Sequence, residues 1–188
     1  MAHILCYGDS NTFGYDPRGW LGGRYESDVR WTGRLKAAGY AVRNLGQNGL
    51  TVPSPGEAYL LTDRLGDLSE LHTLTVMLGT NDLLRDAAIS AEDVAARLSR
   101  WLTAVTAALP PEKLLLISPV PLVPGDWVTD PRQLTESARL GTCLSASAAA
   151  AHVRFADAAA WGVQLAFDGV HFTPSGHAAF AAGLLQIL

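Results

Sequence analysis

The stretch ILCYGDSNTFG at residues 4–14 decides how the rest of the chain is interpreted. The short apolar run over residues 3–7 predicts a buried β-strand, and this run stops at Gly8-Asp9-Ser10. In an α/β protein, the crevice for a ligand opens at the carboxyl ends of the strands. Ser10 stands at such a point. Its hydroxyl becomes a nucleophile only where the chain also supplies a base and donors for an oxyanion.

Strand and helix patterns alternate along the whole chain, which is typical of an α/β fold. After the first strand, we expect strands at residues 40–45, 74–78, 114–118 and 153–155, and helices at 29–38, 55–68, 90 to before Pro110, 130–151 and 173–188. Five parallel strands with helices on both faces make a three-layer α/β/α sandwich of flavodoxin-like type. No repeat, low-complexity run or linker divides the chain, so we expect one domain over residues 1–188.

The predicted topology brings polar residues from distant parts of the chain to one edge. Because the carboxyl ends of parallel strands gather at one edge of a sheet, the residues that follow those strands should lie together. These residues are Ser10, Asn48-Gly49, Asn81 and the proline-rich loop after Ser118, which includes Trp127.

Composition excludes several classes of function. The chain has 188 residues, of which 48% are hydrophobic, and its net charge of -4 comes without a basic cluster, which argues against nucleic-acid binding. No apolar stretch reaches the roughly 18 residues that span a bilayer, and no leader pattern precedes the first strand, so we expect a cytoplasmic protein. The two cysteines, Cys6 and Cys143, make no disulfide framework, and we expect no catalytic role for either.

A candidate base lies near the far end of the chain. His171 follows Asp168 by three residues, and an aspartate can fix the tautomer of an imidazole and stabilise the imidazolium that forms. The other histidines have structural explanations: His3 in a strand, His72 and His152 at the surface, and His177 in a capping or solvent position. Asn81 can donate to an oxyanion, and Gly49 can bring a backbone N–H close to a ligand.

Each of these signals has an ordinary alternative, because serine, asparagine and glycine are common in turns and caps. The order of the four is more specific, and through it the chain resembles the SGNH hydrolase superfamily, also called GDSL-type esterases. The blocks are Gly8-Asp9-Ser10-Asn11, Asn48-Gly49-Leu50-Thr51, Gly79-Thr80-Asn81-Asp82 and Asp168-Gly169-Val170-His171. Residues 28–33, 77–82 and 169–173 are further similar to bacterial arylesterases that also act as acyltransferases. Asn11 departs from the leucine of the family name.

This resemblance implies an SGNH hydrolase fold and a serine esterase for short-chain acyl or aryl esters, with an acyl-enzyme intermediate and acyl transfer as a further activity. Ser10 is then the nucleophile, His171 the base and Asp168 its partner. The backbone N–H groups of Ser10 and Gly49 and the side chain of Asn81 form the oxyanion hole. No metal or organic cofactor is needed. We expect Asp9 and Asp82 to hold their loops through local hydrogen bonds.

Substrate choice is open at this point. Candidates for the substrate pocket are Trp20, Leu50, Val120, Leu122 and Trp127, for which a place in the core or at a subunit contact is an equal alternative. A carbohydrate O-acetylesterase would use the same catalytic residues. A non-catalytic flavodoxin-like module that binds a small ligand is the alternative from another class. We expect a small-molecule ester as partner, neither nucleic acid nor membrane, and, by the resemblance to oligomeric arylesterases, a homo-oligomer.

Overall fold

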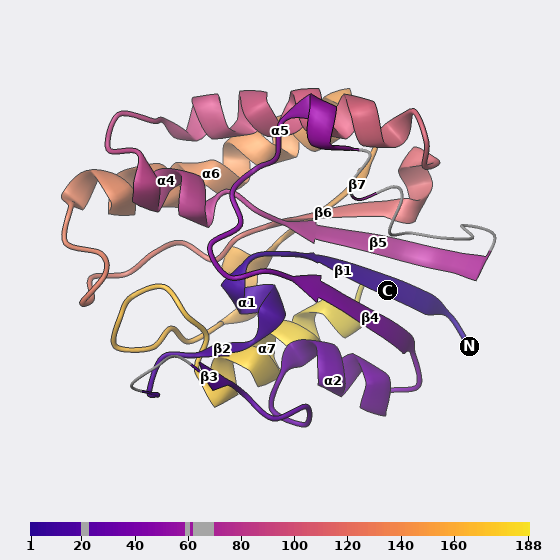
Figure 1. Ribbon diagram of the computed structural model, residues 1–188, viewed down its shortest axis with the longest axis horizontal. Helices are drawn as coiled ribbons and strands as arrows, with labels where there is room; N and C mark the ends of the chain where they lie inside the picture. Colours follow the sequence, from indigo (N-terminus) through magenta and orange to yellow (C-terminus); the bar gives the residue numbers. More distant parts are fainter. Residues whose placement is uncertain (20–22, 59–60, 62–69) are drawn as a thin grey trace.

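The computed structural model describes residues 1–19, 23–58, 61 and 70–188. A five-stranded parallel sheet forms the middle layer (Figure 1). Its strands, in spatial order, are β4 (Ala41–Gly46), β1 (His3–Gly8), β5 (Leu71–Met77), β6 (Leu114–Ser118) and β7 (Arg154–Asp157). Counted along the chain this is the order 2-1-3-4-5, the flavodoxin-like arrangement. The predicted α/β class and the five parallel strands are confirmed.

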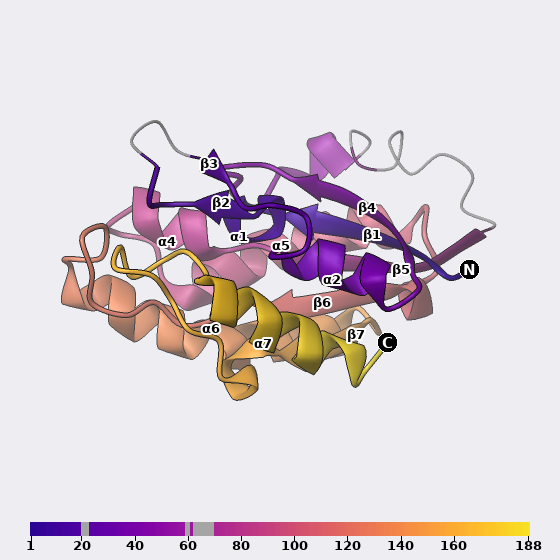
Figure 2. The ribbon, with the colours of Figure 1, turned by 90° about the horizontal axis from the view of Figure 1, so that it is seen from below.

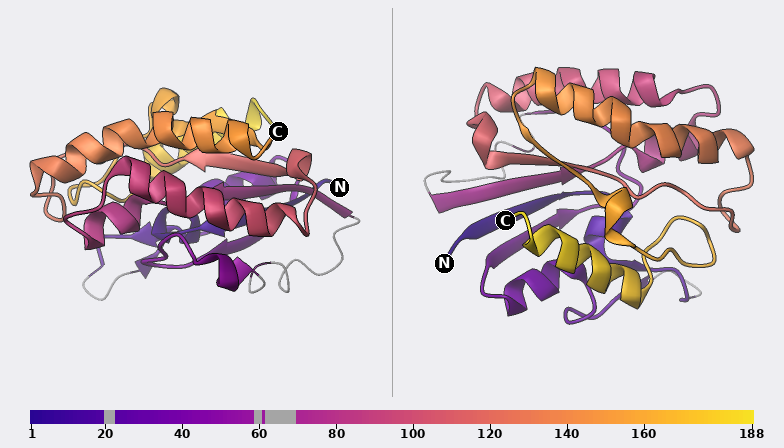
Figure 3. Two further views of the ribbon diagram at one scale, coloured as in Figure 1. Left: turned by 90° about the horizontal axis from the view of Figure 1, so that it is seen from above. Right: turned by 180° about the vertical axis from the view of Figure 1, so that it is seen from behind.

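Helices cover both faces of the sheet. On one face, α5 (Ala91–Thr106) and α6 (Pro131–Ala150) lie side by side, as Figure 3 shows. On the other face, α2 (Trp31–Ala37) packs along α7 (Pro174–Leu185), as Figure 2 shows. Two separate apolar clusters result, one on each side of the sheet, with Trp101 at the centre of the first and Trp31 in the second.

The main helices begin where the sequence indicates. Ser90 caps α5 in a capping box with Asp93, and the apolar positions of one helical face, Val94, Leu98, Trp101, Leu102 and Val105, are all buried. Asp130 caps α6 and Thr173 caps α7, each followed by a proline in the first turn. Among the described residues, no helix combines the length and apolar character required to cross a membrane.

Besides the short helix α1 (Ser10–Phe13), which no pattern predicted, three features differ from the sequence-based expectation. A six-residue helix, α4 (Thr80–Arg85), follows β5 directly, and a two-stranded antiparallel hairpin joins β2 (Tyr15–Asp16) to β3 (Gly23–Arg24). The helix expected over residues 55–68 begins as a 3₁₀ turn, η1 (Pro55–Glu57), and residues 59–60 and 62–69 lie outside the described part. Such short elements carry too few residues for a periodic apolar pattern to reveal them. Two other 3₁₀ turns, η3 (Pro111–Lys113) and η4 (Ala158–Trp161), lead into β6 and out of β7.

The sheet register aligns the strand ends that carry the site. Gly8, the last residue of β1, lies opposite Gly46 of β4 and Met77 of β5. The short helix α1 (Ser10–Phe13) starts just beyond Gly8 and packs on β4. Gly46 leaves room for this packing, because a methyl group in its place would lie 2.1 Å from the backbone nitrogen of Phe13. The position of Ser10 therefore depends on the absence of a side chain at Gly46.

We expect Gly46→Ala to lower the free energy of unfolding by about 1–3 kcal/mol, the usual cost of overpacking, and to displace α1. Thermal unfolding measures this cost. The control is Gly56→Ala, because the nearest atom to a methyl group at Gly56 is 4.0 Å away. Equal melting temperatures for the two variants would contradict the proposed role of Gly46.

His177 does not occupy the capping or solvent position that the sequence suggested, and that expectation is wrong. Its side chain is fully buried, its ring meets the rings of Tyr25 and Phe172 edge-on, and its Nδ1 accepts a hydrogen bond from the backbone N–H of Trp31. Burial, together with the positive charges of Arg34 and Arg30, lowers the pKa of His177 to about 3. The spacing of His177, Phe180, Ala181 and Leu184, all buried on one face of α7, was the signal for this placement.

Because an unfolded histidine has a pKa of about 6.5, the unfolded chain binds a proton at residue 177 between pH 6.5 and pH 3, and the folded chain does not. The contribution of neutral His177 to the free energy of unfolding is therefore fully present above pH 6.5. Below that pH it is lost at about 1.4 kcal/mol per pH unit. We expect His177→Gln to reduce this loss by about 2 kcal/mol between pH 7.5 and pH 5, measured by denaturant unfolding. Comparing the two proteins cancels the contributions of other groups. If the free energy of unfolding falls by the same amount in both proteins between pH 7.5 and pH 5, His177 does not cause the loss.

Candidate active site

The turn after β1 presents Ser10 at the start of a helix. Asp9 caps α1, because its Oδ1 accepts a hydrogen bond from the backbone N–H of Asn11 at 3.0 Å. The helix ends at Gly14, which adopts a left-handed conformation with φ of 90°. The first helical residue has no intrahelical acceptor for its N–H. Ser10 therefore offers both a hydroxyl and a free backbone donor at the carboxyl edge of the sheet.

The segment before α7 brings an imidazole to this hydroxyl. His171 Nε2 lies 3.0 Å from Ser10 Oγ, and His171 Nδ1 lies 2.6 Å from Asp168 Oδ2. Asp168 is fully buried and His171 is 2% exposed. The structure thus joins residues that are 161 positions apart into one line of hydrogen bonds.

The carboxylate of Asp168 is held in place by its own segment. Its Oδ1 accepts hydrogen bonds from the backbone N–H groups of Val170 at 2.9 Å and His171 at 3.0 Å. Burial opposes its ionisation, but hydrogen bonds from the His171 ring and from these two N–H groups outweigh it and hold the pKa of Asp168 below its usual value. Asp168 is therefore a fixed anion beside Nδ1, which favours a proton on that nitrogen and leaves Nε2 to accept one from Ser10.

Two further residues with candidate donors, Gly49 and Asn81, line the same cleft as Ser10. Gly49 follows β4 with φ of 72°, and Asn81 is the second residue of α4. Asn81 Nδ2 donates to Leu50 O at 3.1 Å and approaches Asp9 Oδ2 at 3.5 Å, which fixes its orientation. Within the described part of the chain, no acceptor is hydrogen-bonded to the backbone N–H of Ser10 or Gly49. Both N–H groups are thus available to an oxygen atom in the cleft.

A cleft of about 400 Å³ opens over these groups, and ten residues line it: Ser10, Tyr15, Asn48, Gly49, Asn81, Leu84, Arg85, Trp127, Val170 and His171. The rings of Tyr15 and Trp127 lie on the imidazole of His171, with ring centroids 4.5 and 5.0 Å away. Sequence reasoning missed Tyr15, Leu84 and Arg85. The first lies in the unexpected hairpin and the others in the last turn of α4, so no periodic pattern marked them.

The structure places only Trp127, among the described pocket candidates, in this cleft. Backbone hydrogen bonds from residues 126 and 127 to residues 167 and 168 hold its loop beside His171. Leu50 packs against the core under α5 and reaches Asn81 only through its carbonyl, Val120 packs with the cluster under α7, and Leu122 is buried with Val128 and Val170. These three were expected in the pocket and do not line it, because burial in apolar clusters turns them away. Trp20 lies outside the described residues.

Asp9 holds its own loop through a local hydrogen bond to the Asn11 N–H, as expected from the sequence, whereas the contacts of Asp82 are long-range and the expectation of a local role is wrong for it. Asp9 is 1% exposed, and burial raises its pKa to about 6. Asp82 accepts a hydrogen bond from the backbone N–H of Val52 at 3.0 Å and pairs with Arg97 at 3.4 Å, and burial raises its pKa as well. These contacts connect the strand ends that carry Ser10, Gly49 and Asn81. Cys6 is fully buried, as expected of a small apolar residue.

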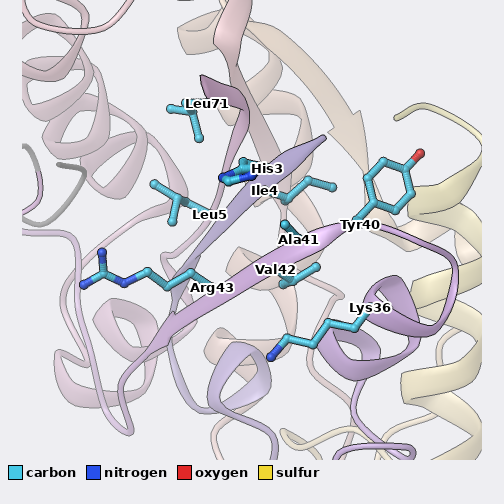
Figure 4. Close-up of a pocket in the computed structure, with 9 residues that line it drawn as sticks. All are labelled: His3, Ile4, Leu5, Lys36, Tyr40, Ala41, Val42, Arg43 and Leu71. Atoms are coloured by element: carbon cyan, nitrogen blue, oxygen red, sulfur yellow. The ribbon is translucent and has the colours of Figure 1, made fainter. Parts of the chain in front are cut away.

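A larger hollow, of about 520 Å³, lies at the amino ends of β1, β4 and β5. Figure 4 shows that Leu5 and Arg43 project to one side of the strands and Tyr40 to the other, so this hollow wraps around the sheet edge. Its lining residues contain no nucleophile with a base. Among the described residues, no cluster of three or more histidine, cysteine or acidic side chains could hold a metal. The cleft at Ser10 is lined by both a hydroxyl nucleophile and a base, 3.0 Å apart.

Comparison with known proteins agrees with this geometry. The aryl esterase of M. smegmatis superposes with a TM-score of 0.83 at 28% identity, over 99% of this chain and 97% of that one. A carbohydrate acetylesterase family member from Sinorhizobium meliloti superposes with a TM-score of 0.84 at 27% identity, over 100% and 97%. No curated protein sequence matches the chain.

The family model described as the GDSL-like lipase/acylhydrolase family matches residues 6–179. The match begins in β1, before Ser10, and ends in α7, beyond His171, so it includes all four sequence blocks. The predicted resemblance to SGNH hydrolases, and with it the class of serine esterase, is confirmed at the level of the family. The chain belongs to the GDSL-like lipase/acylhydrolase family.

Proposed function

We propose that the protein hydrolyses short-chain acyl or aryl esters, with Ser10 as the nucleophile, His171 as general base and acid, and Asp168 as the partner of His171. The observation that carries the proposal is the unbroken line from Asp168 Oδ2 through His171 to Ser10 Oγ, with distances of 2.6 and 3.0 Å. Nucleophile and base within hydrogen-bond reach, with the base oriented by a third group, is the signature of an activated serine.

In the first half of the reaction, Ser10 Oγ attacks the carbonyl carbon while its proton passes to His171 Nε2. The carbonyl oxygen becomes an oxyanion, which accepts hydrogen bonds from the N–H groups of Ser10 and Gly49 and from Asn81 Nδ2. Asn81 keeps its bond to Leu50 O and releases its long contact of 3.5 Å with Asp9 Oδ2 to make this bond. The intermediate then collapses, and the leaving alcohol takes the proton from Nε2. The product is an acyl group esterified to Ser10.

In the second half, water loses its proton to Nε2, attacks the acyl group and releases the acid. An alcohol that enters in place of water yields a new ester by the same steps, so we include acyl transfer in the proposal. The rings of Tyr15 and Trp127 beside His171 support this, because they offer an apolar surface to an incoming alcohol where it must be deprotonated.

The cleft supports aryl esters as the first substrate class, since aromatic groups pack favourably on the rings of Tyr15 and Trp127. The M. smegmatis aryl esterase, similar over 99% of this chain, supports the same class. Acetylated carbohydrates are the second candidate, supported by the Sinorhizobium meliloti neighbour with a TM-score of 0.84. A panel of phenyl acetate and acetylated xylose oligomers, each with and without a competing alcohol, separates aryl esterase, carbohydrate acetylesterase and acyltransferase by kcat/KM and by products.

The mechanism requires Ser10, so we expect Ser10→Ala to reduce kcat on 4-nitrophenyl acetate by at least about 10³-fold. The melting temperature should stay close to that of the wild type. Ser175→Ala is the control, because Ser175 is an exposed serine in the first turn of α7. Wild-type levels of hydrolysis in Ser10→Ala would remove the serine mechanism, and a wild-type protein inactive on every ester would favour the non-catalytic binding module.

Asn11 positions the base in this mechanism. Its Nδ2 donates to Val170 O at 3.0 Å, and its Oδ1 accepts from the backbone N–H of Phe172 at 2.9 Å. The two hydrogen bonds fix the backbone on either side of His171, and Asn11 is next to Ser10 in the sequence. One buried amide thus sets the separation between the hydroxyl and the imidazole. A leucine, as in the family name, has no donor or acceptor for these bonds.

We expect Asn11→Ala to lower kcat by about 10–100-fold with little change in KM, because a displacement of about 1 Å at the reacting groups has an effect of that order. Ser147→Ala is the control, since Ser147 is also a buried polar residue that bridges two elements, α6 and Ala95 O of α5, without contacting α1 or the His171 segment. Steady-state kinetics and thermal unfolding of both variants make the comparison. A kcat for Asn11→Ala equal to that of Ser147→Ala would assign Asn11 to general stability only.

A further inference from the structure

We propose that Arg85 makes the site selective for esters whose acyl part ends in a carboxylate, that is, for hemiesters of short dicarboxylic acids. This inference rests on the esterase function proposed above and names its substrate class. It starts from a cation in the cleft that the hydrolytic mechanism does not use.

Arg85 belongs to the same short helix as Asn81 and lines the same cleft. Its guanidinium lies against Gly49, because a methyl group built on that glycine would stand 2.5 Å from Arg85 Nη2. Gly49 carries one of the N–H groups assigned to the oxyanion. The guanidinium is therefore next to the oxyanion hole, on the side of the cleft formed by the turn after β4.

This guanidinium has no partner within the described residues. No carboxylate or carbonyl of the described chain is hydrogen-bonded or ion-paired to it. Many other arginines are engaged, either with carboxylates or with backbone carbonyls: Arg18, Arg97, Arg139, Arg24, Arg34, Arg132 and Arg154. A planar guanidinium presents five donors in a geometry that matches a carboxylate. Arg85 is thus free to bind an anionic group that enters the cleft.

The geometry of the reaction places that group in the acyl part of the ester. The leaving oxygen must face His171 Nε2 to receive its proton, so the alcohol part lies beside the rings of Tyr15 and Trp127. The carbonyl oxygen points to Gly49 and Asn81, and the Arg85 guanidinium lies against Gly49 in the same cleft. A carboxylate carried by the acyl chain, on the side away from His171, reaches the guanidinium. One carried by the alcohol is directed toward the aromatic rings.

The test compares two esters of similar size, mono-4-nitrophenyl glutarate and 4-nitrophenyl valerate, with the uncatalysed rate of each subtracted. We expect the ratio of their kcat/KM values to fall by up to about fivefold in Arg85→Gln, the effect of one ion pair made by an exposed arginine. Arg85→Lys should retain part of the preference, because lysine keeps the charge but loses the bidentate geometry. Raising the salt from 20 mM to 500 mM should reduce the wild-type ratio as well.

Arg100→Gln is the matched control, since Arg100 is an exposed arginine of α5 that borders a different hollow. 4-Acetoxybenzoate against phenyl acetate places the carboxylate on the alcohol instead, and a preference confined to that pair would overturn the acyl assignment. A glutarate-to-valerate ratio that is the same in wild type and Arg85→Gln would overturn the role of Arg85.

The proposed function and this inference fail in different ways. The proposed esterase function fails if the wild-type protein shows no Ser10-dependent hydrolysis of the neutral ester. The binding of monomethyl glutarate to Ser10→Ala, followed by NMR titration, tests Arg85 even then. Weaker binding when Arg85→Gln is added supports the inference, and unchanged binding overturns it.

Discussion

The site depends on a contact between the two ends of the chain, made by the side-chain amide of Asn11. It holds the backbone at Val170 and Phe172, at 3.0 and 2.9 Å, and so fixes the imidazole between them. Apart from the bond between Ser10 and His171 themselves, this contact links the two segments directly through hydrogen bonds. A hydrogen bond between a hydroxyl and an imidazole tolerates only a few tenths of an ångström of displacement. Packing alone is a less exact constraint than two directed hydrogen bonds at positions 170 and 172, on either side of His171.

Two buried aspartates beside the site have opposite electrostatic environments. Both lose solvation, but Asp168 gains hydrogen bonds from two backbone N–H groups and from the His171 ring, which lower its pKa. Asp9 receives fewer, and burial raises its pKa to about 6. The difference suits their positions. Asp168 must stay charged to stabilise an imidazolium, whereas Asp9 caps α1 and orients Asn81 through contacts that need no full charge.

Most elements were predictable from the sequence, including the short strand β7, but a few of the short ones were not. The apolar runs of β1, β5 and β6 and the capped helices α5, α6 and α7 carry periodic patterns over enough residues to be identified. The helix α4 and the hairpin of β2 and β3 have no such pattern, and they contribute Tyr15, Leu84 and Arg85 to the cleft. His177 was expected in a capping or solvent position, whereas its spacing with Phe180 and Leu184 places it in the core.

The sequence by itself determined the fold class, the order of the strands' polar ends and the residue types of the site, because strand and helix periodicity and the four short blocks are local properties of the chain. Only the tertiary structure decided which of those residues meet. The line from Asp168 to Ser10, the grip of Asn11 and the placement of Arg85 against Gly49 all join positions far apart in sequence. It also decided that Trp127 faces the cleft, while Leu50 and Val120 are half-buried against the two core clusters and Leu122 is buried. An apolar side chain in a loop has the same local pattern in either place, and the packing of the whole chain determines which surface it meets.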